Sequence, residues 1–449
     1  MLSADSGFSK RITRNILRIS ALVLAIFVGQ GAAFADQIPS GWQAENMQPI
    51  GFSGLNGHPG AFKLAIKQVN GHWYLYMGHS FDEGWSILDV TNPRDPKYVK
   101  FIPFHGPKDV LTSQVSLHGD ILITAVNSAT ERPDMGAAAL IWDISDPTNP
   151  KQVSQWIAGP RGSHRDSYPG GKYADLAASV PGFRWYILQI LDISDPAHPK
   201  EVGRWWQPGS KDSDPEPQTA IGFHGPANVS PDGKMISMGF TPDVVNLDIS
   251  DIAHPKLIGR LQMTPPFASV GPQSIHTVLP LWDRKLLFAS SEAMASGCDT
   301  DALSFAALID NKDPSKPRLI SMFPVPRPAK NAPYKDFCDK GGRFGPHNVS
   351  QEIHSPDVAK PGNIMYVTYF NAGLRAFDIS DAHLPTEVGW FIPPELSGAP
   401  ARTGPHASPI NWTEDVLVDT RGNIYITDDK WGVWILRDTR AGKPAATAK

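Results

Sequence analysis

The stretch ILDISDPAHPKEVGRWWQPG, residues 190–209, decides the fold. It holds a short apolar run, an Asp-Ser pair, a proline-containing turn, a second apolar run and a Pro-Gly stop. The same pattern begins again at Ile87, Ile141, Asn246, Leu308 and Ala376. A pattern repeated at intervals of about 50 to 65 residues marks an array of one supersecondary unit, and this spacing is typical of β-propeller blades.

Each unit is expected to form two adjacent strands of a blade. Residues 190–193 make a run of the length of a buried strand, too short for a helix. The Asp and Ser that follow can hydrogen-bond the backbone of the turn, and proline fixes φ there. Residues 201–206 alternate polar and apolar side chains, as a half-exposed outer strand does.

We therefore predict an all-β fold, a seven-bladed β-propeller spanning residues 36–438, with a disordered tail at 439–449. Strand patterns at residues 62–69, 72–79 and 85–90 belong to the first blade, and those at 415–419, 424–427 and 433–436 belong to the last. The last blade lacks a fourth strand, and residues 46–54 resemble the missing outer one. We expect this N-terminal strand to close the ring, because closure removes an exposed sheet edge.

These strands, with Ile-Leu-Asp-Ile at residues 190–193 as the example, resemble the LVIVD repeat family of exported bacterial proteins. The resemblance covers nearly all of the chain after residue 35 and implies the propeller fold. It implies little about function, because similar propellers serve many purposes.

Residues 1–35 are predicted to be a signal peptide. Four basic residues between positions 10 and 18 precede the apolar run 19–28, and Ala33-Phe34-Ala35 forms a cleavage site. A membrane anchor is the alternative, but the apolar run is short and the cleavage site follows directly. Cleavage leaves 37 Lys and Arg against 44 Asp and Glu. We therefore expect a periplasmic protein that binds no nucleic acid and is not stably inserted in a membrane.

One histidine lies in each loop that leads from an outer strand to the next inner strand. They are His58, His105, His164, His224, His276, His347 and His406. Two interpretations stay open. Each imidazole bonds within its own blade, or neutral imidazoles from several blades bind one divalent metal ion.

We predict His164, His224, His276, His347 and His406 as the candidate metal ligands, and a structural role for His58 and His105. The placement is similar to that in carotenoid-oxygenase-type and selenium-binding, methanethiol-oxidase-type propellers. That similarity implies iron or copper before zinc.

Three carboxylates are candidates for proton transfer. Glu292 follows the apolar strand 286–289 without a turn residue, and Glu352 follows His347 in what should be an inner strand. Asp428 lies in a strand-connecting loop, where turn formation is the competing role. A carboxylate here could ligate a metal, orient a ligand histidine or act as a general base.

Cys298 and Cys338 lie in two long loops that should be neighbours on the face that carries the histidines. In an exported protein such a pair indicates a disulfide, and thiolate ligation of the metal is the alternative.

The sequence carries no His-Glu-x-x-His, Gly-x-Ser-x-Gly or glycine-rich phosphate motif. We predict a periplasmic metal-dependent oxidoreductase or lyase that acts on a small organic substrate, aromatic ones included, at the axial mouth. The alternative is a non-catalytic scaffold that binds a protein or cell-envelope partner through its loop face.

Overall fold

The computed structural model describes residues 36–58, 60–80, 82–267, 274–298, 304–396 and 408–440. The predicted signal peptide, His406 and residues 441–449 of the predicted tail lie outside them. Contacts group Phe34–Lys449 into one unit, to which everything below refers. Thr439 donates its N–H to the Asn46 carbonyl, and Arg440 pairs with Asp438.

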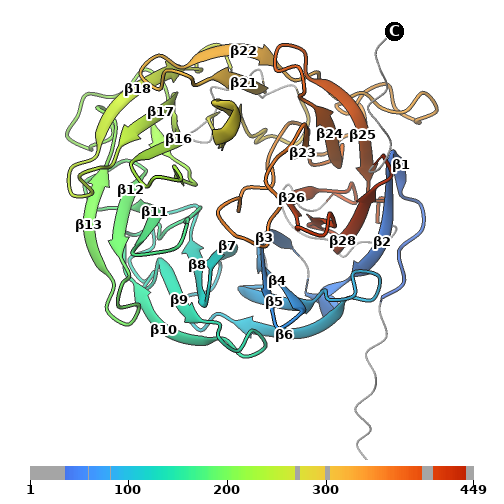
Figure 1. Ribbon diagram of the computed structural model, residues 1–449, viewed down its shortest axis with the longest axis horizontal. Coiled ribbons are helices and arrows are strands. Elements are labelled where there is room, and N and C mark those ends of the chain that lie inside the picture. The colour runs from blue at the N-terminus through green and yellow to red at the C-terminus, as the bar shows by residue number, and fades with distance from the viewer. Residues whose placement is uncertain are drawn as a thin grey trace, which may run out of the picture. The chain divides into compact units, whose positions relative to one another are not determined.

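Antiparallel sheets follow one another around a central axis, and their outer strands lie along the perimeter (Figure 1). The first four strands are β3 (Ala61–Val69), β4 (His72–His79), β5 (Gly84–Asp89) and β6 (Lys97–Pro103). The next four are β7 (Leu111–His118), β8 (Ile121–Asn127), β9 (Ala139–Asp143) and β10 (Lys151–Trp156). These two groups form one eight-stranded sheet, in which His79 and Thr112 are the only paired residues between β4 and β7.

Three sheets continue the ring. The first contains β11 (Tyr173–Ser179), β12 (Tyr186–Asp192) and β13 (Lys200–Trp205). The second contains β14 (Gly222–Phe223), β15 (Asn228–Val229), β16 (Met235–Thr241), β17 (Asp243–Asp248) and β18 (Lys256–Gln262). The third contains β19 (Thr277–Leu281), β20 (Leu286–Ser290), β21 (Ala306–Asp310) and β22 (Arg318–Met322).

The N-terminal strands complete the last two sheets. One contains β23 (Ile364–Thr368), β24 (Leu374–Asp378), β25 (Thr386–Ile392) and β1 (Gln43–Glu45). The other contains β26 (Thr413–Val418), β27 (Ile424–Asp428), β28 (Gly432–Asp438) and β2 (Met47–Ser53). The predicted pairing of the N-terminal strand with the last sheet is confirmed, from Met47 opposite Asp438 to Ser53 opposite Val433. Two short 3₁₀ turns, η1 (Leu55–Gly57) and η3 (Trp282–Arg284), are also present.

An Asp at the end of each unit's buried strand closes the turn, as the repeat predicted. Its carboxylate accepts the N–H of the residue two positions on, at 2.8 Å for Asp192 and Ser194. The other acceptors are Asp89, Asp143, Asp248, Asp310, Asp378 and Asp438. Asp438 therefore ends the degenerate last unit like its counterparts. The side-chain bond replaces a backbone partner and fixes the turn that leads to the outer strand.

Most outer strands carry a glycine or serine where they touch the turn of the next sheet, whereas β6 carries Lys100 there and bonds Asn149. A Cβ atom on Gly203 would lie 2.0 Å from the Ile252 carbonyl oxygen, and one on Gly51 would lie 2.0 Å from that of Pro93. Where serine occupies the position it bonds instead, as Ser321 Oγ does to the Ala382 carbonyl at 2.7 Å. The outer strand of one sheet therefore packs against the turn of the next sheet.

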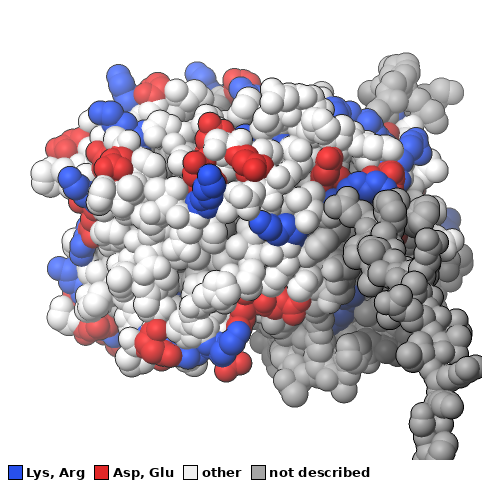
Figure 2. Space-filling view, turned by 90° about the horizontal axis from the view of Figure 1, so that it is seen from below, with Lys and Arg blue, Asp and Glu red and all other residues white. Residues whose placement is uncertain are grey.

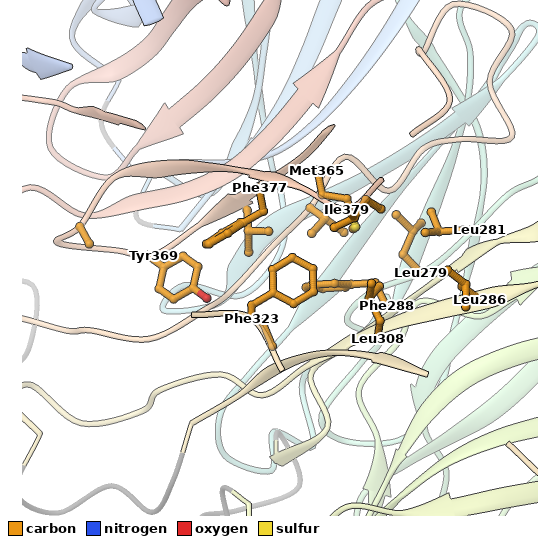
Figure 3. Close-up of a cluster of buried hydrophobic side chains, with 14 of the residues drawn as sticks. Leu279, Leu281, Leu286, Phe288, Leu308, Phe323, Met365, Tyr369, Phe377 and Ile379 are labelled. Atoms are coloured by element: carbon orange, nitrogen blue, oxygen red, sulfur yellow. The ribbon is translucent and has the colours of Figure 1, made fainter. Parts of the chain in front are cut away.

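Apolar side chains fill the spaces between sheets. In Figure 3, Phe288, Phe323 and Phe377 meet between the β19–β22 and β23–β25 sheets. Their rings pack edge to face, with centroids 5.4 and 5.0 Å apart. This packing gives aromatic pairs a favourable quadrupole contact as well as buried area.

The segment after His347 differs from the prediction of an inner strand. Val349 forms an isolated bridge with Val367 and Val358 forms another with Asp419, and the rest of residues 351–361 runs in turns and irregular backbone. The Asp357 carboxylate accepts the Gln68 N–H, and the Ala359 N–H donates to Val418. These distant bonds replace the pairing that a strand would make.

The face in Figure 2 carries Lys and Arg side chains beside Asp and Glu side chains along its upper and lower margins. This face therefore presents both signs of charge rather than a field of one sign. Within the described ranges, the structure contains no helix with the length and apolar character needed to cross a membrane.

Candidate metal centre

A cavity of about 400 Å³ lies at one end of the axis. Its wall includes Leu111, the first residue of β7, and His276, which directly precedes β19. The loops that start the inner strands therefore surround it. Four predicted ligands and Glu292 line this one cavity: His164, His224, His276 and His347.

The four imidazoles form a continuous row. Ring centroids are 4.6 Å apart between His164 and His224, between His224 and His276, and between His276 and His347. Each histidine enters from a different sheet or its leading loop, so the row exists only because the sheets surround one axis.

Backbone bonds place these histidines in equivalent positions. The N–H groups of His276 and His347 donate to Ser290 and Thr368, the last residues of β20 and β23, each at 2.9 Å. The His164 N–H donates in the same way to Ala177 of β11, also at 2.9 Å. Each ring therefore projects from the start of its sheet toward the axis.

Glu292 follows β20 and joins the row. One ligand atom each from His224, His276 and Glu292 lies within 4.8 Å of the others. Glu292 Oε2 is 3.4 Å from His276 Nε2, and Oε1 is 3.6 Å from His347 Nε2. The Arg343 guanidinium donates to Oε1, so each carboxylate oxygen faces a different neighbour.

Three of the four histidines have an anchored Nδ1 atom. His347 Nδ1 donates to the Glu414 carbonyl at 2.8 Å, and His164 Nδ1 lies 3.1 Å from Asn127 Oδ1. His276 Nδ1 lies 2.9 Å from Thr277 Oγ1. Such bonds orient a ring. In His276 the Arg165 guanidinium also lies 3.2 Å from Nδ1 and 3.4 Å from Nε2, so a metal ion at Nε2 would compete with this contact. His224 Nδ1 is buried and has no hydrogen-bond partner among the described residues.

Burial keeps the row uncharged. Burial, together with the neighbouring charge of Arg165, lowers the pKa of His164 to about 3. Burial also places the pKa values of His224, His276 and His347 well below the ordinary imidazole value. Neutral imidazole is the form that binds metal ions.

Arg165 holds the backbone of His276 and the neighbouring side chains in place. Its guanidinium donates to the His276 carbonyl at 2.5 Å, to Asn348 Oδ1 at 3.0 Å and to Gln351 Oε1 at 2.8 Å. Burial lowers its pKa to about 10, still above neutral pH, so a full charge lies beneath the histidines.

The other predicted residues lie elsewhere. Glu352 is buried, accepts a bond from Ser116 Oγ at 2.9 Å and does not line the cavity. Asp428 accepts the Trp412 and Lys430 N–H groups, which is the competing role of a turn residue.

Among the remaining histidines, His58 bonds Asp82 at 2.8 Å and stacks on Phe101, in keeping with the structural role predicted for it. His105 is exposed.

Three functional side chains were missed from sequence. Arg165 and Arg343 lie close to row histidines in the chain, yet nothing in their spacing shows where the guanidinium goes. Glu414 also lines the cavity, and burial raises its pKa well above the ordinary value. Its place opposite His347, with Oε2 3.2 Å from Nδ1, comes from a different sheet and has no local sequence signal.

The predicted disulfide between Cys298 and Cys338 is confirmed, with a Cα–Cα distance of 5.6 Å. Beside it, the Gly297 N–H donates to the Gly342 carbonyl at 2.8 Å. The bridge therefore joins the loop that carries Glu292 to the loop that carries Arg343.

Comparison with known proteins identifies the repeat. The LVIVD repeat matches residues 182–206 and 354–391, which include the turn and outer strand of two units. The chain is an LVIVD-repeat β-propeller protein. No curated protein sequence matches it.

Two solved structures are similar to this LVIVD-repeat protein over most of its length. A protein from Lactobacillus plantarum superposes with a TM-score of 0.52 at 11% identity, covering 81% of this chain and 99% of the other. The Cps50 (Swd1) β-propeller domain of Myceliophteria thermophila gives a TM-score of 0.49 at 12% identity, covering 84% and 96%. At these identities the likeness concerns the fold alone.

Proposed function

We propose that this LVIVD-repeat protein is a periplasmic metal-dependent enzyme whose centre is held by His224, His276 and Glu292. His164 and His347 flank these three and are the further candidate ligands. The observation that carries the proposal is the row of four neutral imidazoles at one cavity, with His224 Nδ1 buried and unpartnered.

The donor set fits a transition metal. Two imidazoles and one carboxylate are the ligands of many non-haem iron sites, and imidazole also suits copper and zinc. Iron or copper is therefore proposed before zinc. A bound ion of this kind would supply Lewis-acid or redox chemistry to an oxidoreductase or lyase. A buried nitrogen without a partner is costly, and a ligand bond would remove that cost.

The cavity wall suggests the substrate class. Phe62, Trp185 and Tyr186 line it together with the polar groups of Ser113 and Asn127. A cavity of about 400 Å³ with aromatic walls and few polar groups is of the kind that holds a small organic molecule. The proposed substrate is such a molecule, aromatic ones included.

Two carboxylates have distinct proposed tasks. Glu292, which accepts a bond from the Arg343 guanidinium, is proposed as a ligand or base. Glu414 is buried, and burial raises its pKa well above the usual range, which favours the protonated form that could donate a proton to a molecule in the cavity. Asp428 is given no role in proton transfer, because its carboxylate accepts the Trp412 and Lys430 N–H groups.

We further infer that the frame has seven blades. The eight-stranded sheet counts as two, β3–β6 and β7–β10, because a single residue pair joins β4 to β7. The turn-closing aspartates then number one for each blade, ending with Asp438.

The experiment is metal analysis of protein purified from the periplasm. We expect about one metal ion per chain in the wild type and at least a tenfold loss in His276→Ala, with His276→Gln as the variant that better preserves the shape of the site. His198→Ala is the matched control, because His198 is exposed and bonds only a turn aspartate. Metal-free wild-type protein of normal stability would favour the scaffold instead.

A further inference from the structure

A second, larger cavity of about 640 Å³ lies at the opposite end of the axis. Its wall includes His118 and Leu281, the last residues of β7 and β19, whereas Leu111 and His276 at the other ends line the histidine cavity. Along the eight residues of β7 the two ends are about 23 Å apart.

Buried charges separate the two cavities. Lys63 Nζ lies 3.5 Å from Asp415 Oδ2 and 3.9 Å from Glu352 Oε1, and all three side chains are nearly inaccessible. Arg165 interacts electrostatically with Asp415 and Glu352, and the two cavities share no lining residue, so we treat the second cavity as a separate compartment.

Nitrogen atoms in this wall lack partners. Arg284 Nη1, His118 Nδ1 and His354 Nε2 are buried and have no hydrogen-bond partner among the described residues. Arg284 is held in place because its Nη2 donates to the Ile379 carbonyl at 2.6 Å, which leaves Nη1 available. His354 Nε2 lies 3.3 Å from the Glu352 carboxylate without forming a hydrogen bond with it.

Much of the wall is apolar and contains proline. Five prolines line it: Pro169, Pro231, Pro280, Pro356 and Pro361. Trp282, Leu281 and Ile353 add apolar surface, and the exposed Lys360 adds a second positive charge against the single carboxylate of Asp283. A mostly apolar cavity with a few convergent polar groups is the usual form of a small-molecule site.

We propose that this second cavity binds a small organic carboxylate, with its apolar body against the prolines and Trp282 and its carboxylate on Arg284 Nη1. A guanidinium with a free N–H is the side chain best suited to a carboxylate. The proposal is independent of the metal centre at the other end.

The test measures benzoate binding by isothermal titration calorimetry, with benzyl alcohol as the uncharged counterpart. We expect saturable 1:1 binding of benzoate, and binding of benzyl alcohol at least tenfold weaker. Arg284→Gln should weaken benzoate binding at least tenfold. Lys360→Gln, at an exposed position that cannot affect folding, should weaken it about threefold.

Two controls locate the ligand. Arg318→Gln removes an arginine from the outer strand of the same sheet, and His276→Ala alters the other cavity; neither should change benzoate affinity. Absence of saturable binding, equal binding of benzyl alcohol, or loss of binding in His276→Ala would overturn the proposal. If Arg284→Gln fails to fold by circular dichroism, an unchanged affinity in Lys360→Gln overturns it.

Discussion

The two carboxylate oxygens of Glu292 face different groups at the wall of the histidine cavity. Its Oε1 atom receives the Arg343 guanidinium, while its Oε2 atom faces His276 at 3.4 Å. Arg343 therefore positions one oxygen of the carboxylate, while the other oxygen faces an imidazole that is proposed as a metal ligand. Arg343 would thus act on the proposed metal centre through Glu292.

Glu292→Gln should raise the dissociation constant of the bound metal at least tenfold, because an amide is a weak ligand and leaves Arg343 without its counter-charge. The constant can be measured by competition with a chelator. Glu201→Gln also breaks a Glu–Arg pair, with Arg204 on an outer strand, and should leave the constant unchanged. Equal affinities in Glu292→Gln and the wild type would remove Glu292 from the ligand set.

Asp175 in β11 makes the protein's stability depend on pH. Burial raises its pKa to about 7 from the ordinary 3.8. Between these values the unfolded chain has lost this proton while the folded chain keeps it. The free energy of unfolding therefore falls as pH rises from about 4 to 7, by up to about 1.4 kcal/mol per pH unit from this group.

Asp175→Asn should remove that component, because asparagine does not titrate. Urea unfolding of both proteins at pH 5 and pH 7.5 checks it: the variant should lose less stability between the two pH values than the wild type. An identical pH dependence in the two proteins would show that Asp175 is not the group responsible.

The strands show which features of an element the sequence pattern predicts and which it does not. Apolar alternation predicted the strands of the first and last sheets to within two residues of their observed ends. It did not predict the small-residue contact, because the position is Gly203 in one unit, Ser154 in another and Lys100 in a third. The residue type at this position differs between units, but a register shift in the strand pairing occurs at each of them. A register shift leaves no pattern in the sequence.

Gly203→Val should lower the free energy of unfolding by about 2 kcal/mol or more, because its Cβ would lie 2.0 Å from a backbone carbonyl of the next sheet. Gly362→Ala is the matched control, since a Cβ there meets nothing within 4 Å. Urea denaturation compares them. A Gly203→Val protein as stable as the wild type would mean that the sheets do not meet at this contact.

At the scale of the whole molecule, repetition explains which parts of the site were predictable. Equivalent loops of a ring must meet at its axis, so one histidine per loop predicted the row. Arg165, Arg343 and Glu414 were unpredictable because each acts through a partner from another sheet. The segment after His347 was predicted wrongly because its hydrogen bonds go to Gln68 and Val418, far away in the chain.

Ring closure by β2 should be essential for stability. A chain that begins at Gly54 loses the buried side chains of Met47, Ile50 and Phe52 and exposes the edge of β28. Each side chain contributes about 1.5 to 3 kcal/mol, so we expect a loss of at least about 5 kcal/mol and aggregation.

Thermal unfolding against a chain that begins at Asp36 measures the effect. A chain that begins at Asn46 lacks only the short β1 and should lose much less stability. If the chain from Gly54 melts with the longer chains, the closing strand is dispensable.

X-ray anomalous scattering from crystals of the protein purified from the periplasm tests the metal centre most directly. Data collected on both sides of the absorption edges of iron and copper locate each element. We predict a peak bounded by His224, His276 and Glu292. A map with no peak there, or with His224 Nδ1 bonded to an ordered water in its place, would contradict the metal centre.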